Sequence, residues 1–301
     1  MEQRLWKGSQ SNYPIAPGHE AAGVVVDVHP DGMPSVSAGD HVAIAFLDRC
    51  MQCEFCRRGD TNLCTGKLHG RSPGVFRQIG GLAEYAVVLT WKLFVLPENL
   101  SFDEIALCEP VACVIHSIRK ANLQFGDEVL VLGGGTMGQL HLLLARLRGA
   151  RVFLSDPDPE KRQLALENGA CEVFEPGDTA AGVQKLTGGI GADAIFVTFG
   201  NQDTADQASA SVSPGGRVIY YSSFPEDVSM NLSPRRLHNQ EVVLDGARGQ
   251  TIEDWNQATR LLANGLLDVR PLISKSYPLA RISEALDHAI DPSAFRIVVN
   301  L

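Results

Sequence analysis

Apolar positions in the first third of the chain come in short runs that are separated by glycine, proline and aspartate. Short runs between such turn residues are typical of β-strands. The strands expected here are residues 22–28, 41–46, 84–89 and 92–96. The first third of the chain is therefore predicted to form a β-rich domain.

From about residue 129 onward, apolar runs alternate with amphipathic stretches of helical length. Strands are expected at residues 128–132, 151–155, 194–197, 217–221 and 242–244. Helices are expected at residues 138–148, 160–168, 180–186, 204–212 and 252–263. Such alternation implies a parallel sheet covered by helices on both faces. The tail then returns to a loop, a helix over residues 282–290 and a strand over residues 296–300.

Length and charge narrow the class of protein. The 301 residues are enough for two domains. Acidic residues number 35 and basic residues 26, which gives a net charge of −9. A surface that binds nucleic acid needs an excess of basic groups. We therefore expect a small-molecule substrate and no nucleic-acid partner.

The chain carries no sign of a membrane or a secretory route. No apolar run approaches the length of a membrane-spanning helix, and the residues after Met1 do not resemble a secretion signal. We therefore expect a cytoplasmic protein without a membrane partner. In a reducing compartment, closely spaced cysteines are metal ligands more often than disulfides.

Four of the seven cysteines lie within fifteen positions, at Cys50, Cys53, Cys56 and Cys64. A loop of this spacing can wrap one tetrahedral zinc ion, and four thiolates leave no open position for a substrate. The sequence therefore predicts a structural zinc site rather than a catalytic one. The other interpretation is two disulfides or four unrelated thiols. The remaining cysteines, Cys108, Cys113 and Cys171, are expected to be small buried residues.

A glycine-rich loop follows the strand expected at residues 128–132 and opens the next helix. It reads Gly133-Gly134-Gly135-Thr136-Met137-Gly138. In a dinucleotide-binding loop the first glycine permits a tight turn, the second lets the backbone approach a pyrophosphate, and the third lets helix and strand pack closely. The helix N-terminus then presents free N–H groups to the phosphates. The cofactor residues predicted are Gly133, Gly135, Thr136, Met137, Gly138, Asp156 and Lys161.

Asp156 ends the next strand, 18 residues after Gly138. A carboxylate at this position accepts hydrogen bonds from the ribose hydroxyls and repels a 2′-phosphate. The other interpretation is an ordinary α/β turn with a solvent-facing aspartate. NAD is the expected cofactor, and NADP stays open because Lys161 and Arg162 follow closely.

Together these features resemble the zinc-containing medium-chain dehydrogenase/reductase family. Besides the cysteines, the loop and Asp156, the resemblance rests on Gly18-His19-Glu20, Ala38-Gly39-Asp40-His41-Val42 and Glu109-Pro110. It covers the chain from about residue 5 to residue 301. It implies an α/β protein with a GroES-like β-rich catalytic domain (residues 1–117 and 268–301, with a zinc lobe at 50–64). A doubly wound Rossmann domain over residues 118–267 would bind NAD.

The resemblance also implies a catalytic zinc in the cleft between the domains. His19 matches the histidine ligand of the family, and Glu20 is a ligand in some members. Glu109 stands where alcohol dehydrogenases have a cysteine and polyol dehydrogenases a glutamate, so a polyol, sugar or cyclitol substrate is implied. The other interpretations are a helix-terminal carboxylate for Glu109 and a satisfied histidine for His19.

The family pattern also contains a cysteine ligand ahead of the first motifs. Aligning Lys7-Gly8 and Gly18-His19-Glu20 places that cysteine upstream of Met1 and puts Arg4 near the usual proton-relay histidine. A misassigned start, an artificially shortened chain and a naturally shortened protein all stay open. With one ligand absent, the chain as given is expected to bind catalytic zinc weakly and to be catalytically impaired, while NAD binding survives.

Two competing functions stay open. One is a non-catalytic, NAD-binding zinc protein. The missing cysteine ligand favours this hypothesis, whereas the presence of His19, Glu20 and Glu109 argues against it. A zinc-free quinone reductase of the same superfamily would generally lack the four cysteines. Bacterial relatives are commonly tetramers, so a homo-oligomer is implied, a tetramer rather than a dimer. Its contacts are expected near residues 242–244 and 266–273, which an isolated domain would leave exposed.

Overall fold

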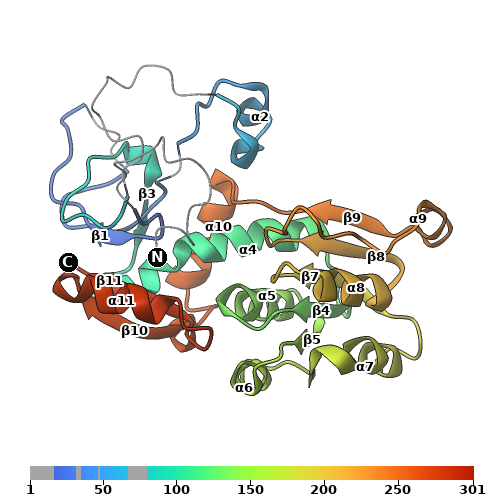
Figure 1. The fold of residues 1–301 in the computed structure, drawn as a ribbon. Helices are drawn as coiled ribbons and strands as arrows, with labels where there is room; N and C mark the ends of the chain where they lie inside the picture. Colours follow the sequence, from blue (N-terminus) through green and yellow to red (C-terminus); the bar gives the residue numbers. More distant parts are fainter. Residues whose placement is uncertain (1–16, 32–34, 47, 67–79) are drawn as a thin grey trace.

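The computed structural model describes residues 17–31, 35–46, 48–66 and 80–301. Its β-strands form three sheets of three, six and two strands. Figure 1 shows the six-stranded sheet and its helices on one side, and the two smaller sheets together on the other. The fold class predicted from the sequence, a β-rich part joined to a doubly wound parallel sheet, is confirmed.

The first third of the chain forms an antiparallel sheet in the order β1-β2-β3. Its strands are β1 (Ala22–Val24), β2 (His41–Ile44) and β3 (Leu93–Leu96), the last preceded by the 3₁₀-helix η3 (Thr90–Lys92). Each strand is shorter than the sequence predicts. The segment between β2 and β3 carries the short helices α2 (Glu54–Arg57) and η2 (Thr61–Leu63), which lie among the four cysteines.

The strand expected at residues 84–89 is not present, and this prediction is wrong. Tyr85, Val87 and Leu89 are 77%, 91% and 62% exposed, and no described strand pairs with this segment. A strand depends on ladder hydrogen bonds and on packing against neighbours. Its alternating apolar pattern alone does not supply either.

The six-stranded sheet is parallel throughout, in the order β6-β5-β4-β7-β8-β9. Its strands are β4 (Glu128–Leu132), β5 (Arg151–Ser155), β6 (Glu172–Phe174), β7 (Ala192–Val197), β8 (Val212–Tyr220) and β9 (Val243–Gly246). β4 and β5 have the predicted bounds, the other predicted strands are shifted or longer, and β6 was not predicted. The strand order reverses between β4 and β7. In such sheets ligands bind at the carboxyl ends of the strands beside this switch point.

Helices cover both faces of this sheet. Val129 and Val131 of β4 pack with the helices α4 (Cys108–Ala121), α5 (Thr136–Leu147) and α10 (Ile252–Ala263). Leu130 and Leu132 of the same strand pack toward α7 (Thr179–Leu186) and α8 (Gln202–Ser211). This burial on both faces explains why the strands read as continuous apolar runs. The helices α6 (Pro159–Glu167) and α9 (Pro234–Gln240) complete this part of the fold, whereas α3 (Phe102–Ala106) contacts β1 and β2.

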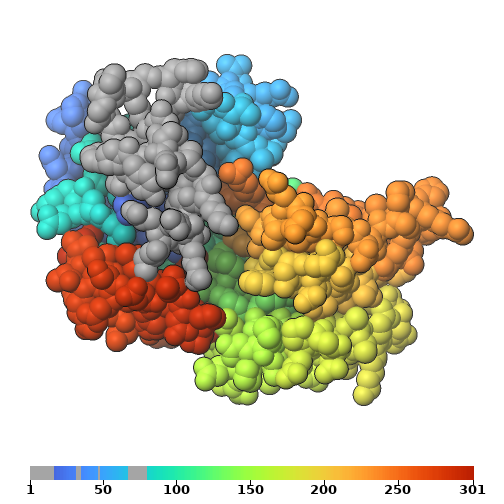
Figure 2. Space-filling view, viewed as in Figure 1, coloured from blue at the N-terminus to red at the C-terminus, as the bar shows by residue number. Residues whose placement is uncertain are grey.

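The tail forms β10 (Ile273–Pro278), α11 (Ile282–Ala289) and β11 (Arg296–Asn300), and its two strands pair in parallel. Figure 2 shows these red residues next to the blue and teal residues of the first third. Residues 266–273, where contacts between subunits were expected, are only partly available for them: Leu266 is 58% exposed. Leu267, Val269 and Leu272 are 6%, 1% and 0% exposed because they pack into the chain's own core.

Two further differences concern single elements. The 14-residue helix α4 was not predicted as a helix, although it is buried along most of its length. Cys171, expected to be buried, is exposed. Among the described residues, no helix has both the length and the apolar character needed to cross a bilayer.

Candidate active site

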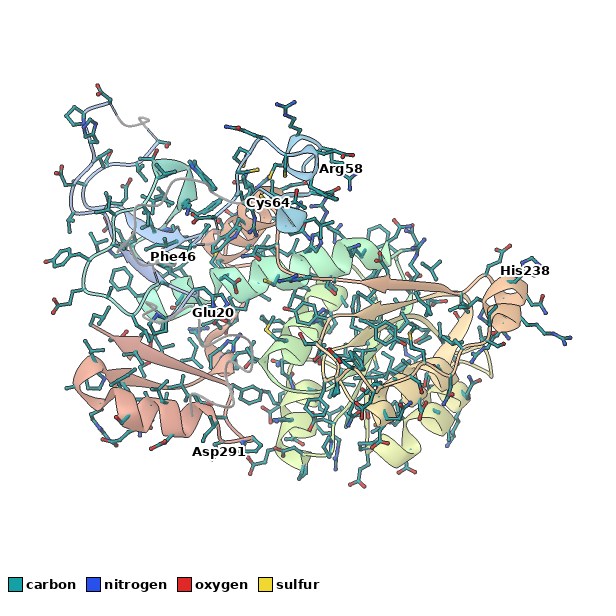
Figure 3. All side chains as sticks on the ribbon, turned by 45° about the horizontal axis from the view of Figure 1, so that its top comes forward. Glu20, Phe46, Arg58, Cys64, His238 and Asp291 are labelled. Atoms are coloured by element: carbon teal, nitrogen blue, oxygen red, sulfur yellow. The ribbon has the colours of Figure 1, made fainter. Side chains whose placement is uncertain are left out.

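The four cysteines at residues 50–64, here called the four-cysteine lobe, converge in space. Their sulfur atoms all lie within 4.8 Å of one another, and Figure 3 labels Cys64 in this lobe. Backbone N–H groups point at the sulfurs: Cys50 donates to Cys64 Sγ at 3.3 Å, and Cys53 donates to Cys50 Sγ at 3.2 Å. None of the four forms a disulfide.

The chemistry of the lobe fits a soft cation such as zinc. Hydrogen bonds from the backbone lower the pKa of the Cys53 thiol to about 5, the Cys56 N–H being the largest cause. Burial raises the pKa of the Cys56 thiol to about 12, so this sulfur gains most from a nearby positive charge. Gly66 packs onto the cluster, because a Cβ there would lie 2.2 Å from Cys50 Sγ. The prediction that these thiols form a closed zinc site stays a prediction.

A second cluster joins His19, Glu20 and Glu109, whose ligand atoms also lie within 4.8 Å of one another. His19 and Glu20 follow Gly18, which adopts a φ of +86° and whose carbonyl accepts a hydrogen bond from the Gly81 N–H at 2.9 Å. Glu109 lies in the first turn of α4, where free N–H groups and the helix dipole favour a carboxylate. Residues that are far apart in the sequence therefore lie close together, and their role as ligands of a catalytic zinc stays a prediction.

Glu109 is 5% exposed. Burial raises the pKa of its carboxyl group to about 7, and the nearby Glu20 carboxylate adds to this rise. Glu109 Oε1 accepts hydrogen bonds from Gln250 Nε2 at 3.0 Å and from the Cys113 thiol at 3.4 Å. Two carboxylates this close repel one another, so a divalent cation between them fits the donor set. The expectation of a cysteine ligand upstream of Met1 stays a prediction, and Arg4 lies outside the described residues.

Arg296, which the sequence does not single out, contacts both candidate sites. Its Nη2 lies 2.7 Å from Glu20 Oε1 and 3.6 Å from Met137 Sδ. The arginine at the start of β11 therefore links the carboxylate cluster to the glycine-rich loop. The run that contains it, residues 296–300, gives no sign of this role, because only the fold brings the two ends of the chain together.

The glycine-rich loop has the geometry that its sequence predicts. Gly133 has a φ of +102°, a conformation that favours glycine. A Cβ on Gly138 would lie 1.8 Å from the Gly133 carbonyl oxygen, whereas nothing lies within 4 Å of a Cβ placed on Gly135. The loop is thus tight where helix and strand pack and open where a pyrophosphate would approach. Thr136 and Met137 then form the first turn of α5.

Asp156 lies beside this loop at the end of β5 and is 7% exposed. Its carboxylate accepts hydrogen bonds from the Gly134 N–H at 2.6 Å and from the Asp158 N–H at 2.8 Å. Lys161 contacts the tail instead, donating from Nζ to the Pro292 carbonyl at 2.6 Å. The position of Asp156 is therefore fixed by the loop itself.

His19, Glu20 and Arg296 line a cleft of about 1910 Å³ between the first third of the chain and the tail. Figure 3 shows Glu20 near the N-terminal end of α4 and close to the tail. A small polar molecule in this cleft would meet an imidazole and a carboxylate on one wall and a guanidinium on the other.

Comparison with known proteins agrees with this geometry. Residues 1–98 match the alcohol dehydrogenase GroES-like domain, and residues 136–264 match the zinc-binding dehydrogenase family. The 2-dehydro-3-deoxy-L-galactonate 5-dehydrogenase of Pseudoalteromonas atlantica is 32% identical over 289 residues, which are 95% of this chain and 80% of that protein. The D-arabitol-phosphate dehydrogenase of Enterococcus avium is 28% identical over 98% of this chain and 84% of its own length.

A solved structure gives the same result. A protein of Sinorhizobium meliloti, crystallised with NADP bound, superposes with a TM-score of 0.85 at 27% identity, covering 96% of this chain and 84% of that one. The chain belongs to the zinc-binding dehydrogenases of the medium-chain dehydrogenase/reductase family. It is therefore an enzyme that uses a nicotinamide cofactor. Membership of the zinc-binding dehydrogenases argues against the hypothesis of a zinc-free quinone reductase.

Proposed function

We propose that this protein oxidises a secondary alcohol of a polyol, a polyol phosphate or a sugar acid and transfers the hydride to NAD, with a zinc ion held by His19, Glu20 and Glu109. The observation that carries the proposal is the meeting of these three side chains within 4.8 Å, joined through Arg296 to the glycine-rich loop. The names of the two enzyme relatives support this substrate class.

Each group of this chain then has a defined task. When bound, zinc would polarise the substrate hydroxyl and lower its pKa. His19 offers a ring nitrogen as a ligand atom, while Glu20 and Glu109 each offer a carboxylate oxygen. Arg296 holds Glu20 in place, and the Gly135 backbone and the N-terminus of α5 bind the cofactor phosphates. The protein supplies position and field, and the cofactor carries the redox step.

The surroundings of Asp156 support NAD over NADP. The guanidinium of Arg162, which could otherwise take a 2′-phosphate, donates to the carbonyls of Asp156 and Pro157 at 2.8 and 2.9 Å. It also lies 3.0 Å from Glu175 Oε1. A 2′-phosphate would therefore meet the Asp156 carboxylate without a free cation from Arg162.

A substrate panel tests the proposal. The full chain, loaded with zinc and NAD, is incubated with polyols, polyol phosphates, aldonates and simple monohydric alcohols, and NADH formation is followed by absorbance. We expect turnover with at least one polyhydroxylated substrate, slow where only these three side chains hold the zinc, and a strong preference over monohydric alcohols. A protein that binds NAD and two zinc ions per chain but turns over none of these substrates would overturn the proposed substrate class.

A further inference from the structure

Gln250 stands between the two candidate metal sites. It lies in the loop between β9 and α10, directly before the N-cap residue Thr251, and is 2% exposed. An amide buried to this extent is costly unless its donors and acceptors are satisfied. The hydrogen-bond partners of Gln250 therefore show which groups fix its position and which groups it fixes in turn.

The side chain of Gln250 faces the carboxylate cluster. Its Nε2 donates to Glu109 Oε1 at 3.0 Å, and its Oε1 accepts from the Cys113 thiol at 3.3 Å. The same thiol lies 3.4 Å from Glu109 Oε1, so its one hydrogen is shared between the two oxygens. The three side chains form a closed triangle in which Glu109 Oε1 accepts both hydrogen bonds. Among the described residues no hydrogen bond reaches Glu109 Oε2, so this oxygen is left for a cation.

The backbone around Gln250 faces the four-cysteine lobe. Arg49, which directly precedes Cys50, donates from Nη2 to the Gln250 carbonyl at 3.3 Å. Asn62, between Cys56 and Cys64, donates from Nδ2 to the Arg248 carbonyl at 3.0 Å. The same amide nitrogen lies 3.2 Å from His116 Nε2 on α4. The four-cysteine lobe therefore contacts both the loop that carries Gln250 and the helix that carries Glu109.

We propose that Gln250 is a positioning residue through which the folded four-cysteine lobe fixes Glu109 for metal binding. This inference rests on the proposed function of the cluster. The lobe holds residues 248–250 by their carbonyl groups, and the Gln250 amide holds one oxygen of Glu109 so that the other faces His19 and Glu20. Residues that orient a metal ligand in this way typically change metal affinity or activity by about 10- to 100-fold when they are replaced.

The first test replaces Gln250 by methionine, which keeps the volume and removes the hydrogen bonds. Zinc is counted per chain after equilibrium dialysis against a zinc buffer, and the visible spectrum is recorded after exchange with cobalt. We expect the second metal of Gln250→Met to bind about tenfold or more weakly and its cobalt spectrum to change. The lobe metal and NAD binding should stay as in the wild type. A purely structural role would lower thermal stability without altering the cobalt spectrum.

Gln163→Met is the matched control. Gln163 Nε2 also donates to a glutamate, Glu167 Oε1 at 3.1 Å, but on the exposed surface of α6. It should leave both metals unchanged. If Gln250→Met does not fold, Gln250→Asn keeps the amide at a shorter reach and should show a smaller loss. Asn62→Ala, which leaves all four thiols intact, should weaken the second metal in the same direction.

The outcomes separate the two proposals. A wild-type chain that holds only one metal and shows no turnover overturns the proposed function, and with it the role of Gln250. A wild type with two metals and activity, beside a folded Gln250→Met or Gln250→Asn with the same affinity and cobalt spectrum, overturns the role of Gln250 alone.

Discussion

The carboxyl group of Glu109 has the most strongly altered surroundings in the carboxylate cluster. It is buried, it lies near a second carboxylate, and its pKa is raised to about 7 for these two reasons. A bound cation would reverse the repulsion and hold the carboxylate ionised. These surroundings support our proposal that Glu109 is a metal ligand and not only a carboxylate at the start of a helix.

Replacement of Glu109 by glutamine should remove the charge and keep the shape. We expect kcat/KM to fall by at least about a hundredfold, the upper end of the effect seen when even an outer-shell partner of a metal ligand is lost. NAD binding, measured by fluorescence titration, should not change because the cofactor loop lies in the other part of the chain. Retention of full activity would show that Glu109 is not a ligand.

The single carboxylate of Asp156 is proposed to set the preference for NAD over NADP. Asp156→Ser should bring the affinity for NADP closer to that for NAD, because the repulsion of the 2′-phosphate is removed. Both dissociation constants can be measured by calorimetry on the wild type and the variant. Tighter binding of NADP than of NAD by the unmodified protein would contradict the assignment.

Sequence patterns could identify the residues of both clusters but not the groups that support them. His19, Glu20, Glu109 and the cysteines belong to short motifs, and the structure brings each set together. Gln250, Cys113 and Arg296 belong to no motif. Their partners are determined by tertiary contacts between distant segments, which the local pattern of residues does not contain.

Among the elements, β4, β5, α10 and β11 have the predicted bounds. β4 and β5 are apolar runs of strand length, and the apolar residues of α10 follow the period of a helix. α4 was not predicted because its buried residues form a nearly continuous run and because it carries Pro110 in its first turn. A proline is tolerated there, since the first N–H groups of a helix have no intrahelical partner.

The four-cysteine lobe is an element whose regular structure is too short to be stable alone. Cys53→Ser should therefore release about one zinc per chain and destabilise the lobe, since the closed site needs four thiolates. NAD binding should survive in the folded fraction. Elemental analysis beside fluorescence titration checks both statements. A variant that keeps the full zinc content of the wild type would show that the lobe does not bind zinc through Cys53.

At the scale of the whole molecule, the buried side chain of His141 on α5 contacts α4 and strand β7 of the large sheet. Its ring lies 2.7 Å from the Met137 carbonyl and 2.9 Å from Ser117 Oγ, and it packs on Phe196. Complete burial lowers the pKa of this histidine to about 4. The folded protein therefore keeps His141 neutral at a pH at which the unfolded chain, with a pKa of about 6.5, binds a proton.

Acid should for this reason reduce the stability of the fold. As pH falls from about 7.5 to about 5, the unfolded state gains the proton first, and His141 alone should cost about 2 kcal/mol of unfolding free energy. His141→Gln does not titrate in this range, so its loss over the same interval should be smaller by that amount. Denaturant unfolding at both pH values measures the difference. Equal losses in the two proteins would contradict the assignment.

The edge of the large sheet supports the expectation that the protein assembles with copies of itself. Among the described strands, β9 is the outermost on its side, and Val243 and Leu244 are only partly buried. An unpaired edge strand can pair with another chain, so we expect a homo-oligomer, a tetramer rather than a dimer. Light scattering at about micromolar concentration should give a mass well above 32.5 kDa. A lysine in place of Val243 should shift the protein toward monomers.

The ion pair between Glu20 and Arg296 has a consequence for the order in which the protein is made. The two residues lie near opposite ends of the chain, whereas all strands of the six-stranded sheet come from its middle. During translation, this sheet and its helices can leave the ribosome and fold while the tail is still being synthesised. The carboxylate cluster reaches its final arrangement only when β11 has emerged. A chain that ends before β11 would thus be able to bind the cofactor but not to keep Glu20 in place.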